Sequence, residues 1–145
     1  MQSFSSDPQA IAEHYARFSD AANRHDWSTI ADLFAEDALW ETAAGTLGFR
    51  FQGRSAIHDG LVHNTSTLEV LHYQGAPPVV DLMAPDRARA RTSISELLRV
   101  FATGEVKHLF GVYDDELTRR DGRWRFTHRS FTLRWETDER PRDGR

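Results

Sequence analysis

The sequence predicts an α+β fold, with helices in the amino-terminal part of the chain and a mostly antiparallel sheet in the rest. In residues 106–135, two runs rich in aromatic and β-branched residues flank Asp121-Gly122, which is a strong signal for a β-hairpin. Strongly helical periodicity, in contrast, ends before residue 65. One face of the predicted hairpin is apolar and needs a cover, so we expect three helices to pack on a curved sheet.

Three helices are expected from capping residues and apolar spacing. Asp7-Pro8 is typical of a helix start, with Asp as the cap and Pro in the first turn. The apolar stripe that follows at helical spacing consists of Ile11, Tyr15, Phe18 and Ala22. Asp26 is a suitable cap for a second helix at 27–34, and Ser55 for a third that ends near residue 63.

The strands are expected on both sides of the third helix. The first is a short strand at 38–42, and a loop at 45–48 separates it from the apolar segment 49–51. The later strands are expected at 68–73, 79–83 and 87–101, followed by the closing hairpin. Residues 136–145 are polar and are expected to form a tail, which leaves a single domain at 1–135.

Composition excludes several functional classes. The 145 residues include 18 Lys and Arg and 22 Asp and Glu, and these charges are interspersed, so a nucleic-acid partner is not expected. The absence of cysteine excludes disulfides, thiolate metal ligands and a cysteine nucleophile. No apolar run approaches the roughly 20 residues of a membrane span, and the start of the chain lacks a signal-peptide pattern. We therefore expect a cytoplasmic protein that does not bind membranes.

Neither a metal nor another cofactor is expected. The seven histidines include no His-Glu-x-x-His pair, and His58 and His63 are too far apart to stack as helical i,i+4 ligands. The sequence also lacks a Gly-rich phosphate loop and a Gly-x-Ser-x-Gly motif.

Alternation along the strands nominates two candidate catalytic residues. Glu96 lies in a row of apolar residues, where a carboxylate needs a cation or a raised pKa. The alternative is that a bulge turns Glu96 outward, toward Arg99. His72 shares the parity of Leu68 and Val70, so its imidazole can face the covered side as a base or as a hydrogen-bonded core residue.

The same reasoning nominates further residues for an interior site. His108 shares a face with Phe110, and His128 shares one with Trp124 and Phe126. If both faces are covered, these histidines converge with His72 and Glu96. The other candidates, which would line a cavity or simply fill a core, are Tyr15, Phe18, Trp40 and Phe110.

Four segments together resemble the SnoaL-like branch of the nuclear-transport-factor-2-like superfamily: YARFSDAANRHDWSTIADLFAEDALW, FQGRSAI, LHYQG and FGVYDDELTRRDGRWRFTHR. The resemblance covers about residues 8–135. It implies a cone-shaped α+β barrel with an apolar cavity between the helices and the concave face of the sheet. It also implies a homodimer through the outer face, where arginines 87, 89, 91, 123, 125 and 129 would meet acidic residues.

The resemblance also assigns residues. Dehydratase and dehydrochlorinase members pair a histidine on the strand after the third helix with an aspartate near the end of the first helix. His72 falls at the histidine position, but Asn23 stands at the aspartate position, which is a departure. Without a charge, Asn23 stabilises an imidazolium poorly. It can equally be the residue that ends the first helix. His128 falls at the position of a basic site residue on the last strand.

These observations give two alternative functions. The first is a cofactor-independent enzyme that transfers a proton on a hydrophobic, oxygen-bearing small molecule, as a dehydratase, isomerase or cyclase does. His72 would be the base, Glu96 or Asn23 would orient it, and His128 or Tyr15 would stabilise the oxyanion. The second is a non-catalytic protein that binds a hydrophobic metabolite; a purely dimeric scaffold is a third possibility.

Overall fold

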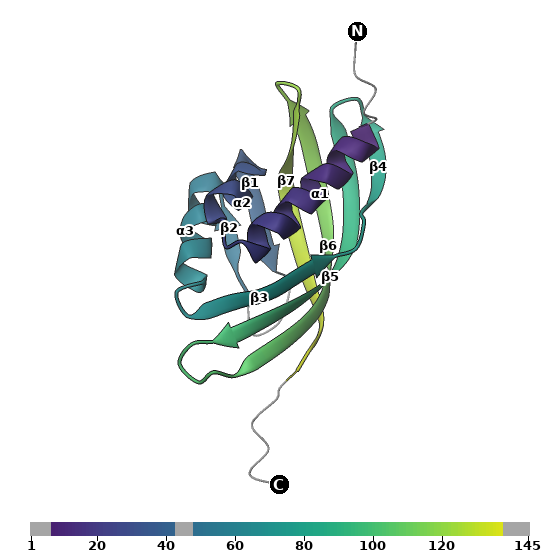
Figure 1. Ribbon diagram of the computed structural model, residues 1–145. Helices are drawn as coiled ribbons and strands as arrows, with labels where there is room; N and C mark the ends of the chain where they lie inside the picture. Colours follow the sequence, from purple (N-terminus) through teal and green to yellow (C-terminus); the bar gives the residue numbers. More distant parts are fainter. Residues whose placement is uncertain (1–6, 43–47, 138–145) are drawn as a thin grey trace.

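The computed structural model describes residues 7–42 and 48–137, and these form an α+β structure (Figure 1). The helices are α1 (Asp7–Asn23), α2 (Trp27–Asp32) and α3 (Arg54–Asn64). The strands are β1 (Phe34–Thr42), β2 (Arg50–Gln52), β3 (Leu68–Gly75), β4 (Val79–Ala84), β5 (Arg87–Val100), β6 (Val106–Arg120) and β7 (Arg123–Glu136). Most of the loop predicted at 45–48, and the predicted tail beyond residue 137, lie outside the described residues.

The strands form one curved, open sheet in the order β2-β1-β7-β6-β5-β3, and β4 pairs with the first part of β5. All neighbouring strands are antiparallel except β1 and β7, which are parallel, so the sheet is mixed. It does not close into the cone-shaped barrel that was expected, because β2 and β3 stand at opposite ends of the strand order.

Helix α1 lies across one face of the sheet, and the long strands bend around it (Figure 1). We call this the inner face and the opposite one the outer face. The predicted apolar stripe of α1 is buried against the inner face. Within it, the Phe18 ring lies 5.8 Å from the ring of Trp40 and 5.4 Å from that of Tyr73. Burial of each large side chain contributes roughly 1.5–3 kcal/mol, so packing on the sheet holds this helix in place.

The other two helices differ from the prediction at their ends. Asp26 caps α2 as expected, since its Oδ1 accepts a hydrogen bond from the Thr29 N–H at 3.1 Å. Helix α2 ends at Asp32, however, and β1 begins at Phe34, which the prediction placed in the helix. Helix α3 begins at Arg54, and its cap is Gly53 with φ +94°, not Ser55.

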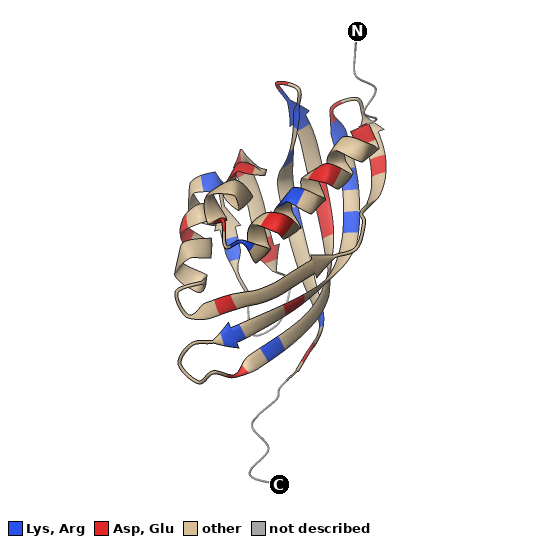
Figure 2. Ribbon diagram, viewed as in Figure 1, with Lys and Arg blue, Asp and Glu red and all other residues tan. Residues whose placement is uncertain are grey.

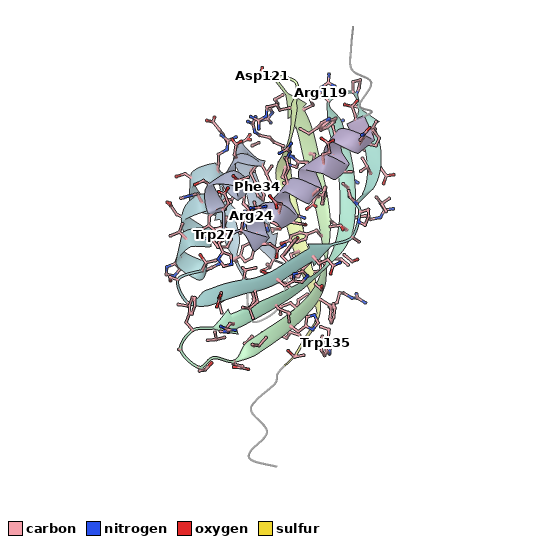
Figure 3. All side chains as sticks on the ribbon, viewed as in Figure 1. Arg24, Trp27, Phe34, Arg119, Asp121 and Trp135 are labelled. Atoms are coloured by element: carbon pink, nitrogen blue, oxygen red, sulfur yellow. The ribbon has the colours of Figure 1, made fainter. Side chains whose placement is uncertain are left out.

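The predicted closing hairpin is confirmed. Asp121 and Gly122 form the two-residue turn, with φ of 53° and 75°, and Arg120 pairs with Arg123. Two positive φ values suit the right-handed twist of the flanking strands, which explains the Asp-Gly pair. Figure 3 shows Asp121 at the tip of this hairpin and Trp135 at the far end of β7.

Three bulges decide which side chains of β3 and β7 face inward. A bulge adds one residue to one strand, so the side chains beyond it change face. In β3 the extra residue is Leu71, between Val70 and His72. In β7 the extra residues are Thr127 and Arg134. Strand β5 pairs with β6 without a shift, so its alternation persists from end to end.

The charged side chains do not separate into one acidic and one basic face. Figure 2 shows Asp and Glu interspersed with Lys and Arg along α1 and the strands. Several form ion pairs within the chain, such as Arg91 with Asp81 at 3.0 Å and Arg89 with Glu116 at 3.8 Å. None of the helices in the described ranges is long and apolar enough to cross a membrane.

Candidate functional site

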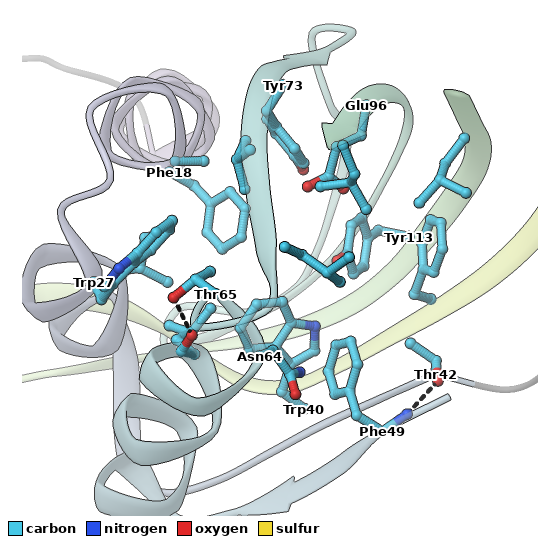
Figure 4. A pocket seen from close by; sticks show the side chains of 18 of the residues that line it. Phe18, Trp27, Trp40, Thr42, Phe49, Asn64, Thr65, Tyr73, Glu96 and Tyr113 are labelled. Atoms are coloured by element: carbon cyan, nitrogen blue, oxygen red, sulfur yellow. Dashed lines mark hydrogen bonds between the residues drawn. The ribbon is translucent and has the colours of Figure 1, made fainter. Parts of the chain in front are cut away.

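A pocket of about 340 Å³ opens between the helices and the inner face of the sheet (Figure 4). Its walls are largely aromatic and include Phe18, Trp27, Trp40, Phe49 and Phe131. The volume is at the small end of the range of about 300–1,000 Å³ that is typical of ligand pockets. No Lys, Arg or His is among the described residues that line it. The pocket therefore suits a small hydrophobic ligand.

Among the described residues, Glu96 is the one charged residue that lines this pocket. The regular alternation of β5 places its carboxylate on the inner face, between the inward side chains of Ile94 and Leu98. Burial raises the pKa of Glu96 to about 7, because an apolar surrounding disfavours the charged form. Its carboxylate makes no hydrogen bond or ion pair with another described residue. Such a group can hold or release a proton at neutral pH.

Tyr73 lies directly opposite Glu96, on the neighbouring strand β3. The Leu71 bulge turns Tyr73 inward, and Asn23 at the end of α1 fixes it there. Asn23 Nδ2 donates to the Tyr73 carbonyl oxygen at 2.8 Å, and Asn23 Oδ1 accepts from the Tyr73 N–H, also at 2.8 Å. Both backbone groups of Tyr73 thus point away from β5, so Tyr73 and Glu96 form the closer, non-hydrogen-bonded type of pair.

Tyr113 on β6 supplies a second phenol to the pocket. Burial raises the pKa of both tyrosines, and the charge of Glu96 adds to this effect, so both hydroxyls stay protonated. The nearby Trp40 side chain and the positive charge of Arg129 act in the opposite direction on the pKa of Tyr113. A neutral phenol beside a titrating carboxylate is a hydrogen-bond donor for a substrate oxygen.

Arg129 lies behind Tyr113 and is completely buried. Its guanidinium carbon is 3.7 Å from the centre of the Tyr113 ring and 4.3 Å from that of Phe18, both within cation–π range. Arg129 Nε donates to Asp115 Oδ1 at 3.2 Å, and the Tyr15 hydroxyl donates to Asp115 Oδ2. This cluster places a buried ion pair behind the Tyr113 ring.

The structure corrects the placement of the two predicted dyad residues. His72 is exposed on the outer face, because the Leu71 bulge reverses the parity of β3. It is therefore on the opposite side of the sheet from Glu96, and the prediction that the two share a cavity is wrong. Asn23 is not part of the pocket wall, since its amide binds the backbone of Tyr73 and, through Nδ2, the Ser19 carbonyl oxygen at 2.9 Å.

The two histidines of the closing hairpin also face outward. His128 follows the Thr127 bulge, so it lies on the outer face with Nε2 3.5 Å from Glu41 Oε1, and Arg129 takes the inward position. His108 and Phe110 lie on the outer face of β6, with their rings 4.3 Å apart. Alternation alone does not say which face of β6 is covered, and the prediction chose the wrong one.

Three of the predicted residues, Glu96, Phe18 and Trp40, line the pocket, whereas Tyr15 does not. The Tyr15 hydroxyl donates to Asp115, and neither residue lines the pocket. The residues that the sequence reasoning missed at the site are Tyr73, Tyr113, Asn64 and Arg129. The sequence held a signal for Tyr73 and Arg129. Val70 and Tyr73 are an odd number of residues apart, as are Phe126 and Phe131, so regular alternation would put the two members of each pair on opposite faces. Odd spacing between buried residues indicates a bulge.

No group of three or more His, Asp or Glu suited to a metal ion occurs among residues 7–42 and 48–137. Five of the six arginines that the resemblance placed at an interface make ion pairs within this chain, namely Arg89, Arg91, Arg123, Arg125 and Arg129. Arg129 binds Asp115 in the core, and Arg89 and Arg91 bind Glu116 and Asp81.

The comparison with protein families agrees with this architecture. The family model of the SnoaL-like domain matches residues 4–130 of the sequence. The chain belongs to the SnoaL-like family. A comparison of this SnoaL-like protein with the curated proteins finds no match.

Solved structures of the nuclear-transport-factor-2-like fold are similar to this SnoaL-like protein. A scytalone dehydratase-like protein from Novosphingobium aromaticivorans has 22% sequence identity and a TM-score of 0.77, covering 94% of this chain and 93% of that one. A hexachlorocyclohexane dehydrochlorinase, LinA-type3, from Novosphingobium barchaimii has 18% identity and a TM-score of 0.75, covering 88% and 86%. A ketosteroid isomerase-like protein from Erwinia carotovora has 15% identity and a TM-score of 0.79, covering 90% and 98%. At these identities the similarity concerns the fold.

Proposed function

We propose that this SnoaL-like protein is a cofactor-independent enzyme that moves a proton on a hydrophobic, oxygen-bearing small molecule. The observation that carries the proposal is the carboxylate of Glu96, unpaired in an aromatic pocket, with its pKa raised by burial to about 7. A general base works best when its pKa is near the working pH. Glu96 thus takes the role that the sequence gave to His72.

Tyr73 and Tyr113 supply the hydrogen-bond donors that such a proton transfer needs beside the base. When Glu96 removes a proton next to a substrate carbonyl, negative charge develops on the carbonyl oxygen. Tyr113 and Tyr73 stand beside Glu96 with hydroxyls that stay protonated, and a donor at that oxygen lowers the barrier. Similar steps, followed by loss of a leaving group or return of the proton elsewhere, give elimination or isomerisation. Dehydratase, dehydrochlorinase and isomerase-like proteins share the fold, which supports this class of reaction.

The test uses exchange of carbon-bound protons in heavy water, followed by NMR with the hydrophobic ketone 2-tetralone as the probe. We expect the protein to accelerate exchange, with a rate that rises as the pH increases through about 7, because the base must be ionised. Glu96→Gln should lower the rate by roughly 10²–10⁴-fold. Tyr113→Phe should lower it by roughly 10²-fold or more. His72→Gln, on the outer face, is the control that should leave it unchanged.

A second candidate function is binding without turnover. The observation that favours it is that Asn23, at the position where the resemblance implies an aspartate, has its amide occupied by the Tyr73 backbone. If 2-tetralone binds the pocket but its exchange is not accelerated, the enzyme proposal fails and the binding function stands.

We also propose a homodimer through the outer face. An aromatic cluster made by His108, Phe110 and Trp135 lies there, and Phe110 and Trp135 are 40% and 51% exposed. Contiguous exposed apolar side chains of this kind are typical of protein–protein interaction sites. Sedimentation of the wild type and of Phe110→Glu tests the proposal. A wild type that sediments as a monomer at micromolar concentration contradicts it.

A further inference from the structure

The pocket has a second polar end, remote from Glu96. Asn64, the last residue of α3, lines the pocket on the side of Trp40 and Phe49, whereas Glu96 lies across the opening from it (Figure 4). Asn64 and Glu96 are well apart in this view, so they are apart in space as well. The rest of the lining is largely apolar and includes several aromatic rings. A ligand that spans the pocket therefore meets a polar group at each end and largely apolar walls.

The side chain of Asn64 is available to a ligand. Its amide makes no hydrogen bond to another described residue, although an amide offers both a donor and an acceptor. Its backbone, in contrast, is held firmly. The Asn64 carbonyl oxygen accepts the Thr67 hydroxyl at 3.2 Å, and the Thr65 hydroxyl donates to the Leu61 carbonyl oxygen at 2.6 Å. The backbone of Asn64 is therefore fixed, whereas its side-chain amide has no hydrogen-bond partner among the described residues. A fixed backbone lowers the entropic cost of binding a ligand.

Charge and shape restrict what can fill the space between these ends. No cationic side chain is present among the described lining residues, and a carboxylate lies at one end, so an anionic ligand would be repelled. The rings of Trp40 and Phe49, which line the same pocket as Asn64, meet edge to face, 5.0 Å apart. Aromatic walls of this kind favour ring-containing ligands, through stacked and edge-to-face contacts.

We propose that the substrate is an uncharged ring compound with an oxygen function at each end, and that Asn64 selects it by binding the oxygen remote from Glu96. This inference rests on the proposed function, since it describes the substrate of the same site. Asn64 is a specificity residue in it and takes no part in proton transfer.

Two probes that share one ring skeleton isolate the contribution of the second oxygen. These are 2-naphthol, with one hydroxyl, and 2,6-dihydroxynaphthalene, with a hydroxyl at each end. Their Kd values can be measured by calorimetry or through the fluorescence of Trp27 and Trp40 in the pocket wall. We expect the wild type to prefer the diol by roughly fivefold, the factor that one net hydrogen bond gives. Asn64→Leu should abolish the preference and leave the Kd for 2-naphthol within about twofold.

Controls separate this proposal from structural damage and from the enzyme proposal. Gln74→Leu removes an exposed amide outside the pocket and should keep the preference. Asn64→Ser, which retains a smaller polar group, should show an intermediate preference and serves if the leucine variant does not fold. Equal affinity of the wild type for both probes, or a preference that survives Asn64→Leu, overturns the inference. Glu96→Gln should slow proton exchange by the factor given above and retain the preference for the diol, so the two proposals fail through different measurements.

Discussion

Arg129 and Asp115 form an ion pair that is fully shielded from solvent, with Arg129 Nε 3.2 Å from Asp115 Oδ1 and no exposed surface on either side chain. Four aromatic rings surround the guanidinium, at 3.7–5.3 Å from its central carbon. Removing two charges from water costs several kcal/mol per ion, and an apolar pair would often be as stable. The intact pair is therefore weak evidence for stability, and what the contacts show is that it holds the guanidinium against the Tyr113 ring.

Replacing Arg129 by methionine should destabilise the protein strongly. The Asp115 carboxylate would remain buried with the Tyr15 hydroxyl as its only partner among the contacts of the wild type. Breaking a buried pair in this way costs about 3–5 kcal/mol, which urea unfolding can measure. Arg91→Met, in an exposed pair with Asp81, is the matched control and should cost less than about 1 kcal/mol. Equal losses of unfolding free energy in the two variants would contradict the claim that burial makes the Arg129 pair costlier to break than an exposed pair.

Glu96 should make stability depend on pH. Burial raises its pKa from 4.5 in the unfolded chain to about 7 in the folded protein. Between these values the folded protein holds a proton that the unfolded chain releases, so acidification from pH 8 to pH 5 removes a penalty of up to about 3 kcal/mol. Glu96→Gln should therefore stabilise the protein more at pH 8 than at pH 5, as measured by urea unfolding at both values. Glu13→Gln, at an exposed position, should show no such difference.

The sequence was most informative where pairing is regular. Asp121-Gly122 predicted the closing hairpin because only a few residue pairs adopt two positive φ values cheaply. Strand β5 has no bulge, so simple alternation placed Glu96 correctly on the inner face. Both conclusions depended on local rules, which operate without knowledge of the rest of the fold.

Such local rules could not predict most of the site. A single extra residue, Leu71, decides that Tyr73 rather than His72 faces Glu96. The Thr127 bulge likewise exchanges His128 for Arg129. Whether a bulge forms depends on how the strand packs on its neighbours and on the helices, which is a tertiary property. Asn64 gave no signal at all, since nothing in its neighbourhood distinguishes it from an ordinary residue at the end of a helix.

Gly111 should tolerate no side chain. An added Cβ would lie 2.2 Å from the Phe131 ring and 2.7 Å from the Thr132 carbonyl oxygen. Because Phe131 lines the pocket, Gly111→Ala must displace that ring or the strand. Overpacking of this kind costs about 1–3 kcal/mol, and we expect 2-naphthol to bind more weakly as well. The control is Gly75→Ala, where the nearest atoms are 3.6 Å away. A Gly111→Ala protein with the stability and the naphthol affinity of the wild type would contradict this account of the Phe131 wall.

Asn23→Asp should weaken the protein rather than create a catalytic dyad. Asn23 Nδ2 donates to the carbonyl oxygens of Ser19 and Tyr73, and a carboxylate has no hydrogen to donate to either. The loss of these bonds, together with a negative charge beside two carbonyl oxygens, should cost about 1–3 kcal/mol in urea unfolding. Gln74→Glu makes the same chemical change at an exposed site of β3, next to Tyr73, and should stay within about 0.5 kcal/mol of the wild type. Proton exchange on 2-tetralone should not increase, since His72 lies on the other side of the sheet from the pocket. A faster, His72-dependent exchange in Asn23→Asp would instead mean that β3 can shift its register and bring the histidine inward.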